Sequence, residues 1–231
     1  MDRFGFWIGA IKNTVNKSTG IILPIVLFFL FSYVSAQQEQ DVPKDAKFYI
    51  DRGVAYGEKG QFDQAIAEFT KALEIDPKSA DAYFNRAVAF AKKKKHDQAI
   101  SDYTRALQTG PKDAGTYYYR GIAYGEKGQF DQAADDFSRA IEMGAKSADV
   151  YYRRGSAYVN KGQIDWGIDD FNKALQIDPK SAEVYYNRAV AYFFKKEYDK
   201  SWMDVKKVQD LGQTIPADFL ARLRKASGKQ M

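Results

Sequence analysis

The chain has 231 residues but no cysteine, only one histidine (His96) and only six prolines. Without cysteine, disulfides, thiolate metal sites and a lipid-bearing cysteine are excluded. The single histidine leaves one candidate for a histidine general base or ligand. The sequence contains no glycine-rich phosphate loop, no Ser/His/Asp set and no cluster with metal-ligand spacing. We therefore expect no catalytic residue, no metal and no cofactor, which favours a protein that is not an enzyme.

A strong charge of one sign is also lacking. The formal net charge is +5, and residues 1–36 hold +2 of it, from Arg3, Lys12, Lys17 and Asp2. The remaining +3 is small for a surface that binds a phosphate backbone. We therefore expect no nucleic-acid partner.

Long hydrophobic runs are limited to the N-terminus. Three basic residues precede an apolar stretch from Ile21 to Val34, and Ser35 and Ala36 follow it. This order is typical of a secretory signal peptide cleaved after Ala36. The stretch is shorter than the ~20 residues that span a bilayer, although an uncleaved anchor is the alternative. We expect the rest of the chain to be exported: periplasmic or secreted if cleaved, and otherwise anchored to the inner membrane through residues 1–36.

The chain is rich in one feature, a period of 34 residues. An arginine followed by glycine or alanine returns five times, and aromatic residues recur around each copy. A period of this size predicts a stack of identical helical units that bury a continuous core between neighbours. The five arginines are Arg52, Arg86, Arg120, Arg154 and Arg188.

Each unit reads as two helices. In the first unit, Tyr49, Gly53 and Tyr56 are four and three residues apart, so they share one face of a first helix. Ala65 and Phe69 repeat this spacing on a second helix. A short polar residue precedes each first helix and is suited to cap its free amides. These predicted N-caps are Asp45, Ser79, Asp113, Ser147 and Ser181.

The pattern resembles the tetratricopeptide repeat family. The second unit carries the signature as Tyr83, Ala87, Phe90, Ala99, Tyr103, Ala106 and Pro111. The resemblance implies an all-α fold, a right-handed superhelical α-solenoid of helix–turn–helix repeats. The expected organisation is a signal peptide at 1–36, a polar leader at 37–45, repeats at 46–79, 80–113, 114–147, 148–181 and 182–215, and a capping helix at 216–227.

An acidic residue follows each of the five arginines by 16 residues, on the second helix. The family usually has an aliphatic residue where this chain has arginine. We expect a structural ladder of ion pairs across the two helices; an arginine row that grips an anionic ligand is the alternative. The acids are Glu68, Asp102, Asp136, Asp170 and Asp204.

The resemblance also implies a concave groove, lined by the first helices, that binds a protein or peptide. Rows of residues 34 apart map onto it, including Val54, Val88, Ile122, Ser156 and Val190. Aromatic residues in these rows are expected either to bind the partner or to pack against the next unit. The candidate groove residues are Phe84, Asn85, Tyr118, Tyr119, Tyr152, Arg153, Tyr186 and Asn187.

These observations predict an exported, non-catalytic scaffold that binds a protein or peptide segment of unspecified identity in its groove. Lys92–Lys95 replace the glycine-bearing turn of the second unit, and a basic run of this kind also suits anionic lipid headgroups. The alternative function is therefore an assembly factor tethered to the inner membrane and facing the periplasm. In that case the uncleaved N-terminus and this lysine-rich turn contact lipid.

Overall fold

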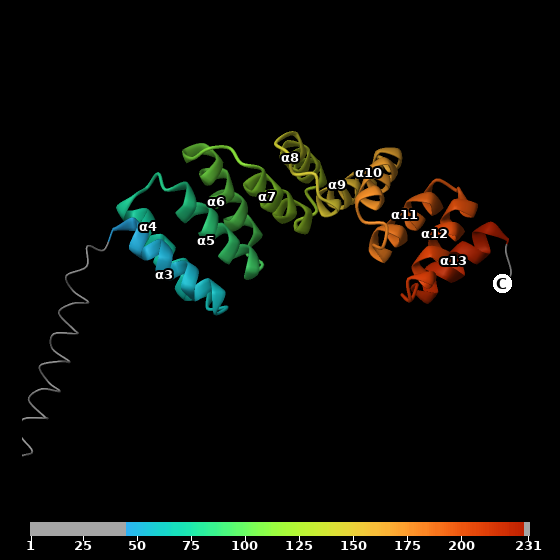
Figure 1. The fold of residues 1–231 in the computed structure, drawn as a ribbon, viewed down its shortest axis with the longest axis horizontal. Coiled ribbons are helices and arrows are strands. Elements are labelled where there is room, and N and C mark those ends of the chain that lie inside the picture. The colour runs from blue at the N-terminus through green and yellow to red at the C-terminus, as the bar shows by residue number, and fades with distance from the viewer. Residues whose placement is uncertain (1–44, 229–231) are drawn as a thin grey trace, which may run out of the picture. The chain divides into compact units, whose positions relative to one another are not determined.

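The computed structural model describes residues 45–228. The predicted signal peptide and all of the polar leader except Asp45 lie outside the described residues. Within 45–228 no helix combines the length and the apolar character needed to cross a membrane. The described part forms one compact unit, and its helices follow one another in sequence order (Figure 1).

The described residues are helical and contain no strand, which confirms the all-α prediction. Two helices fall in each 34-residue period and one more follows the last. The first helices are α3 (Ala46–Glu58), α5 (Ala80–Lys92), α7 (Ala114–Glu126), α9 (Ala148–Asn160) and α11 (Ala182–Phe194). The second helices are α4 (Phe62–Ile75), α6 (His96–Thr109), α8 (Phe130–Glu142), α10 (Ile164–Ile177) and α12 (Tyr198–Asp210), and the last helix is α13 (Ala217–Ser227).

The predicted N-caps are confirmed in all five units. Each of the five side chains accepts a hydrogen bond from the backbone amide three residues later, as Asp45 does from Phe48 at 2.8 Å. This bond satisfies one of the amides that the first turn leaves without a partner. The start of every first helix is therefore fixed by one side chain.

The turn within each unit needs a left-handed residue. Glycine supplies it in three units, with φ near +70° to +80° at Gly60, Gly128 and Gly162. Lysine occupies the same position in the other two, with φ of 58° at Lys94 and 61° at Lys196. A side chain with a Cβ is disfavoured in this conformation, so these two turns are held at some cost in free energy.

Small residues bring the two helices of a unit together. A Cβ at Gly53 would lie 2.5 Å from the Phe69 ring, so the aromatic ring of α4 fills the space that the glycine leaves. The fourth unit keeps this contact between Gly155 and Phe171 but exchanges large and small residues at a second contact. Val159 stands where the first three units have glycine or alanine, and its methyl group lies 2.5 Å from where a Cβ of Gly167 would be. Gly167 therefore makes room for Val159.

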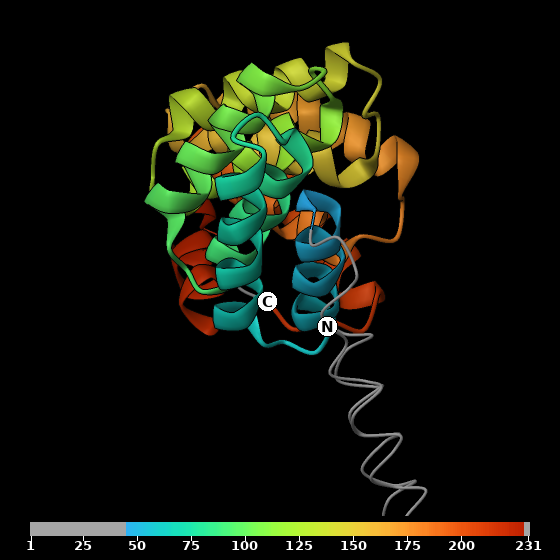
Figure 2. The ribbon, with the colours of Figure 1, turned by 90° about the vertical axis from the view of Figure 1, so that its left-hand side faces the viewer.

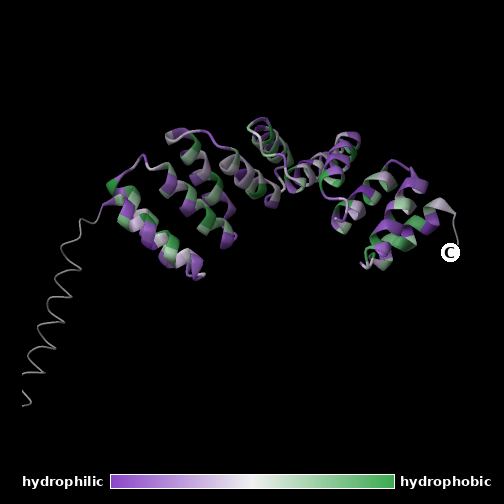
Figure 3. Ribbon diagram, in the orientation of Figure 1, coloured by the Kyte–Doolittle hydropathy of each residue, from purple (hydrophilic) through white to green (hydrophobic). Residues whose placement is uncertain are grey.

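The units stack through their second helices and the next first helices, and the first helices also touch one another. Figure 2 shows α3 and α4 side by side as an antiparallel pair. Hydrophobic and hydrophilic residues alternate around each helix (Figure 3). Buried hydrophobic residues of adjoining units form common clusters, which make up a seam between the units. At one junction Phe137 of α8 and Val150 of α9 are buried in the same cluster. The core is thus distributed along the stack, as the period predicts.

Helix α13 covers the C-terminal end of this seam. Phe219 and Leu223 are buried in one cluster with Val205 and Val208 of α12. The helix ends at Gly228, which is left-handed with φ of 69°. Its outward side is polar, as an open stack requires at its end.

Candidate functional site

The structure brings together the arginine and the acid of each predicted pair. In units two to five the Nε and Nη2 atoms of the arginine donate to the two carboxylate oxygens, at 2.7–3.0 Å. In the first unit Arg52 and Glu68 are more loosely placed, at 3.4 Å. The paired carboxylates are buried in all five units. We call these contacts the ion-pair ladder.

Each arginine of units two to five has a third partner that the sequence analysis missed. Its Nη1 atom donates to a side chain 16 residues earlier, on the second helix of the preceding unit. The ladder therefore ties neighbouring units together as well as the two helices of one unit. The four acceptors are Thr70, Thr104, Ser138 and Asn172, at 2.6–3.1 Å. They are 34 residues apart, and that spacing could have revealed them.

Aromatic rings enclose the guanidinium groups of the ladder. Arg120 lies over the rings of Tyr117 and Tyr124, at 5.6 and 5.8 Å from their centroids. Its hydrogen bonds to Asp136 raise the pKa of Arg120, and burial raises the pKa of Asp136. With two carboxylate oxygens, one hydroxyl and two rings around it, Arg120 is occupied within the protein. The geometry favours the structural role over the binding of an anionic ligand.

Two of the candidate groove tyrosines also link units. Tyr118 of α7 donates its hydroxyl hydrogen to Asp149 of α9, and Arg153 donates from Nε to the Tyr118 hydroxyl at 3.2 Å. Burial, with the bond to Asp149, raises the pKa of Tyr118 to about 12. Tyr152 likewise donates to Glu183 at 2.7 Å and accepts from Asn187 at 3.2 Å. These side chains form bridges between consecutive first helices.

The bridges follow a spacing of 31 residues between tyrosine and acid. Where the tyrosine position holds Phe84, which has no hydroxyl, the position 31 residues later holds Gly115. The ring of Phe84 instead packs against Tyr103 and Tyr119, with centroids 5.8 Å away in each case. The aromatic residues of this row are thus half-buried packing residues in the described structure. This favours the packing alternative for their rings.

The other candidate residues of the groove are placed as follows. Tyr186 packs edge-on against Phe219 of α13, with centroids 5.6 Å apart. Asn85 donates to the backbone carbonyl of Asp81 at 2.8 Å. Tyr119 is 43% exposed, which makes it the most accessible ring of the candidate set.

A continuous accessible face runs along the first helices. Positions spaced by four, three and four residues lie on one side of a helix, and none of the twenty residues at these positions is buried. We call this face the groove stripe. It consists of Lys47, Asp51, Val54 and Glu58 on α3; Asp81, Asn85, Val88 and Lys92 on α5; Gly115, Tyr119, Ile122 and Glu126 on α7; Asp149, Arg153, Ser156 and Asn160 on α9; and Glu183, Asn187, Val190 and Phe194 on α11.

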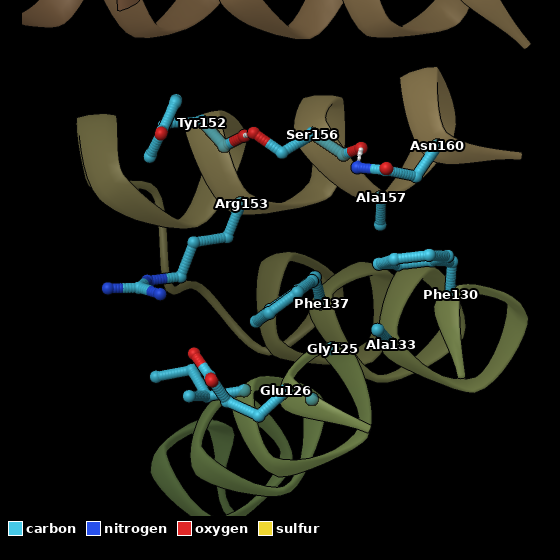
Figure 4. A pocket seen from close by; sticks show the side chains of 12 residues that line it. Gly125, Glu126, Phe130, Ala133, Phe137, Tyr152, Arg153, Ser156, Ala157 and Asn160 are labelled. Carbon is cyan, nitrogen blue, oxygen red and sulfur yellow. Dashed lines mark hydrogen bonds between the residues drawn. The ribbon is translucent and has the colours of Figure 1, made fainter. Parts of the chain in front are cut away.

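A pocket opens on this stripe between α7, α8 and α9 (Figure 4). Ile122 of α7 and Phe130 of α8, which are both half-buried, contribute apolar surface to it, and the buried ring of Phe137 also lines it. Figure 4 shows Glu126 and Arg153 at one end of the pocket, and Asn160 at the other. The pocket thus combines apolar surface with charged and amide groups, a composition common in binding sites for side chains.

The pocket exists because two small residues from different units meet there. Gly125 stands where the fourth and fifth units have Val159 and Phe193, and a Cβ at Gly125 would touch nothing within 4 Å. Ser156 stands where the other units have valine or isoleucine. The sequence analysis placed Ser156 in a groove row but missed Gly125 and Glu126. Extending the groove rows by four more residues would have found Glu126.

We find no candidate metal site in the part of the chain that the structure describes. No group of three His, Asp or Glu side chains there could hold a metal ion. Where two acids are adjacent in sequence, as at Asp135 and Asp136, one belongs to the ladder and the other lies on a different face of the helix.

Comparison with known proteins agrees with this architecture. Family models described as tetratricopeptide repeat match residues 50–114 and 114–143, and one described as TPR repeat matches residues 155–195. No curated protein matches the chain.

Solved structures share the fold. YrrB, described as a TPR protein with an unusual peptide-binding site, is 22% identical with a TM-score of 0.72, covering 84% of this chain and 97% of YrrB. One structure of MamA is 26% identical with a TM-score of 0.66, covering 69% of this chain and 94% of MamA. MamA from residue 41 to its end, from Desulfovibrio magneticus RS-1, is 18% identical with a TM-score of 0.70, covering 73% of this chain and 96% of that one. With its five repeats of two helices and its matches to three repeat models, the chain belongs to the tetratricopeptide repeat family.

Proposed function

We propose that this chain is an exported, non-catalytic scaffold that binds a segment of another protein along the groove stripe. The observation that carries the proposal is the pocket between α7, α8 and α9, which opens on the stripe and offers the half-buried side chains of Ile122 and Phe130 to a partner. YrrB, with the same fold, is itself described as having a peptide-binding site, which supports binding of this kind.

The ladder and the tyrosine bridges support the proposal from another side. The bridges join consecutive first helices, and the ladder joins each first helix to the second helices of its own and the preceding unit, by hydrogen bonds that do not involve a partner. A preformed surface loses little conformational entropy when it binds. The residues left free for binding are therefore the members of the groove stripe outside the bridges, rather than the recurring arginines.

Filling the pocket tests the proposal. Gly125→Leu places a side chain where a Cβ meets nothing within 4 Å. It also removes a glycine from a helix, where glycine is ~1 kcal/mol less favourable than alanine. We expect the variant to be at least as stable as the wild type but to bind exported proteins several-fold more weakly. Photo-crosslinking from position 122, followed by mass spectrometry, measures the binding.

Gly57→Leu is the matched control. It lies at the same position of the first unit, where a Cβ also meets nothing within 4 Å, but it does not line the pocket. We expect the same gain in stability and unchanged crosslinking. If Gly125→Leu crosslinks the same partners as strongly as Gly57→Leu, the pocket is not the binding site.

A further inference from the structure

The groove stripe carries more acid than base, although the whole chain has a net charge of +5. Its cations are Lys47, Lys92 and Arg153. Its acids are Asp51, Glu58, Asp81, Glu126, Asp149 and Glu183. The accessible face of the first helices is thus negative on a protein that is positive overall.

Contacts within the stripe neutralise some of these charges. Lys47 is paired with Asp51 at 2.7 Å, and Arg153 with Asp149 at 2.9 Å. Within residues 45–228, the carboxylates of Glu58 and Glu126 form no ion pair and no hydrogen bond, and both residues are exposed. Among the described residues Asp81 is unpaired as well, and so is Lys92, so three unpaired acids stand against one unpaired cation and the free charge that this face offers to a partner is net negative.

One of these acids stands beside apolar binding surface. Glu126 lines the pocket whose other members include Phe130, Phe137 and Ile122. Two helical turns earlier on the same face, Tyr119 exposes its ring, and an aromatic face attracts a lysine or arginine side chain. A basic side chain next to an apolar one would match both features, whereas an acidic segment would meet repulsion at Glu126.

We propose that the groove stripe selects basic segments: extended stretches in which a lysine or arginine, held by Glu126, stands two residues from an apolar side chain that enters the pocket. This proposal rests on the proposed function and specifies the chemistry of its partner. A spacing of two suits an extended segment because side chains two residues apart point to the same side, so both can face the stripe.

Three short capped peptides of equal length test the proposal, with serine at every second position and, at the positions between, leucine alternating with lysine, glutamine or glutamate. Binding to the full chain is measured by fluorescence anisotropy at low and at physiological salt. We expect the lysine peptide to bind at least tenfold more tightly than the glutamate peptide, with the glutamine peptide between them and with smaller differences at the higher salt. A peptide with serine in place of every leucine but the same lysines should bind more weakly than the leucine–lysine peptide.

Charge reversal locates the contact. Glu126→Lys should weaken binding of the leucine–lysine peptide about fivefold, in line with the loss and reversal of an exposed ion pair. Glu74→Lys is the matched control, because it makes the same change in net charge at an exposed position of a second helix. We expect it to change the affinity less than twofold.

The outcomes separate the two proposals. Equal or tighter binding of the glutamate peptide, or equal effects of Glu126→Lys and Glu74→Lys, overturns the selection for basic segments and leaves the groove as a binding site. If none of the peptides binds, or if Gly125→Leu leaves peptide binding unchanged, the groove itself is rejected together with its selectivity.

Discussion

At the scale of single residues, the arginine of each unit has the largest number of partners. Arg120 contacts a carboxylate in its own unit, a hydroxyl in the preceding unit and two aromatic rings. Taking a charge out of water costs several kcal/mol, and the partners offset that cost only while all of them are present. The ladder is therefore sensitive to the loss of one member.

Substitutions at Arg120 and Asp136 test this dependence. Arg120→Leu leaves a buried carboxylate without its partner, and we expect a loss of about 3–5 kcal/mol in the free energy of unfolding. Asp136→Leu should cost a comparable amount, because it leaves the guanidinium unpaired. The double variant should cost clearly less than the sum, as measured by urea denaturation in a double-mutant cycle. Additive losses would contradict the coupling.

The acid of each ladder pair could be predicted from the sequence because its spacing of 16 residues is constant. The role of the tyrosines could not. A tyrosine ring suits both a groove and a core, and the acid that binds Tyr118 lies in the next unit, where the position varies between glycine, aspartate and glutamate. Only the placement of both helices decides between the two roles.

At the scale of the element, the turns inside the units differ in the free energy that their left-handed residue costs. Glycine adopts the left-handed conformation freely, whereas an L side chain loses ~1–2 kcal/mol in it. The second and fifth units use Lys94 and Lys196 at this position. In the second unit the neighbouring Lys93 is paired with Asp63 of the preceding unit, so part of the basic turn is occupied within the protein.

Replacement of Lys94 tests the cost of the turn. Lys94→Gly should raise the free energy of unfolding by ~0.5–1 kcal/mol, because the relief of strain exceeds the entropy that glycine loses on folding. Gly128→Lys should make the opposite change in the third unit, whose turn has φ of 71°. Thermal unfolding followed by circular dichroism measures both. A loss of stability in Lys94→Gly would show that the lysine side chain contributes more than its backbone costs.

The pocket could not be predicted from the sequence patterns of single units. Helix starts followed from the capping residues, and the face of each helix followed from its spacing. The hollow depends on Gly125 and Ser156 being small at the same junction, although they belong to different units. The pattern of one unit does not contain both residues, so it does not indicate the hollow.

At the scale of the whole molecule, the period predicted the number and the order of the repeats, because each unit buries its apolar face only against its neighbours. Export depends on residues 1–36, which lie outside the described residues, and it remains part of the proposal.

The mature N-terminus tests export. We expect intact-mass analysis of the chain from its source cell to show a product that begins at Gln37 in the exported fraction. A product that keeps Met1 and sediments with membranes would favour the tethered assembly factor instead. Ala36→Arg, which replaces the small residue at the cleavage point, should abolish the shorter product and serves as the control.

The tyrosine bridges have a consequence for how such a chain changes in evolution. Units one and three are near copies in sequence, which suggests gain of units by duplication. A bridge, however, joins a tyrosine in one unit to an acid in the next, so it forms only where two consecutive units carry the right residues. A copy of the fourth unit inserted after it would keep a bridge on each side, because that unit carries both Asp149 and Tyr152. A copy of the third unit inserted after it would place Gly115 opposite the first Tyr118 and leave that hydroxyl without its acid. The residue at the Asp149 position therefore decides which units can be duplicated without the loss of a bridge.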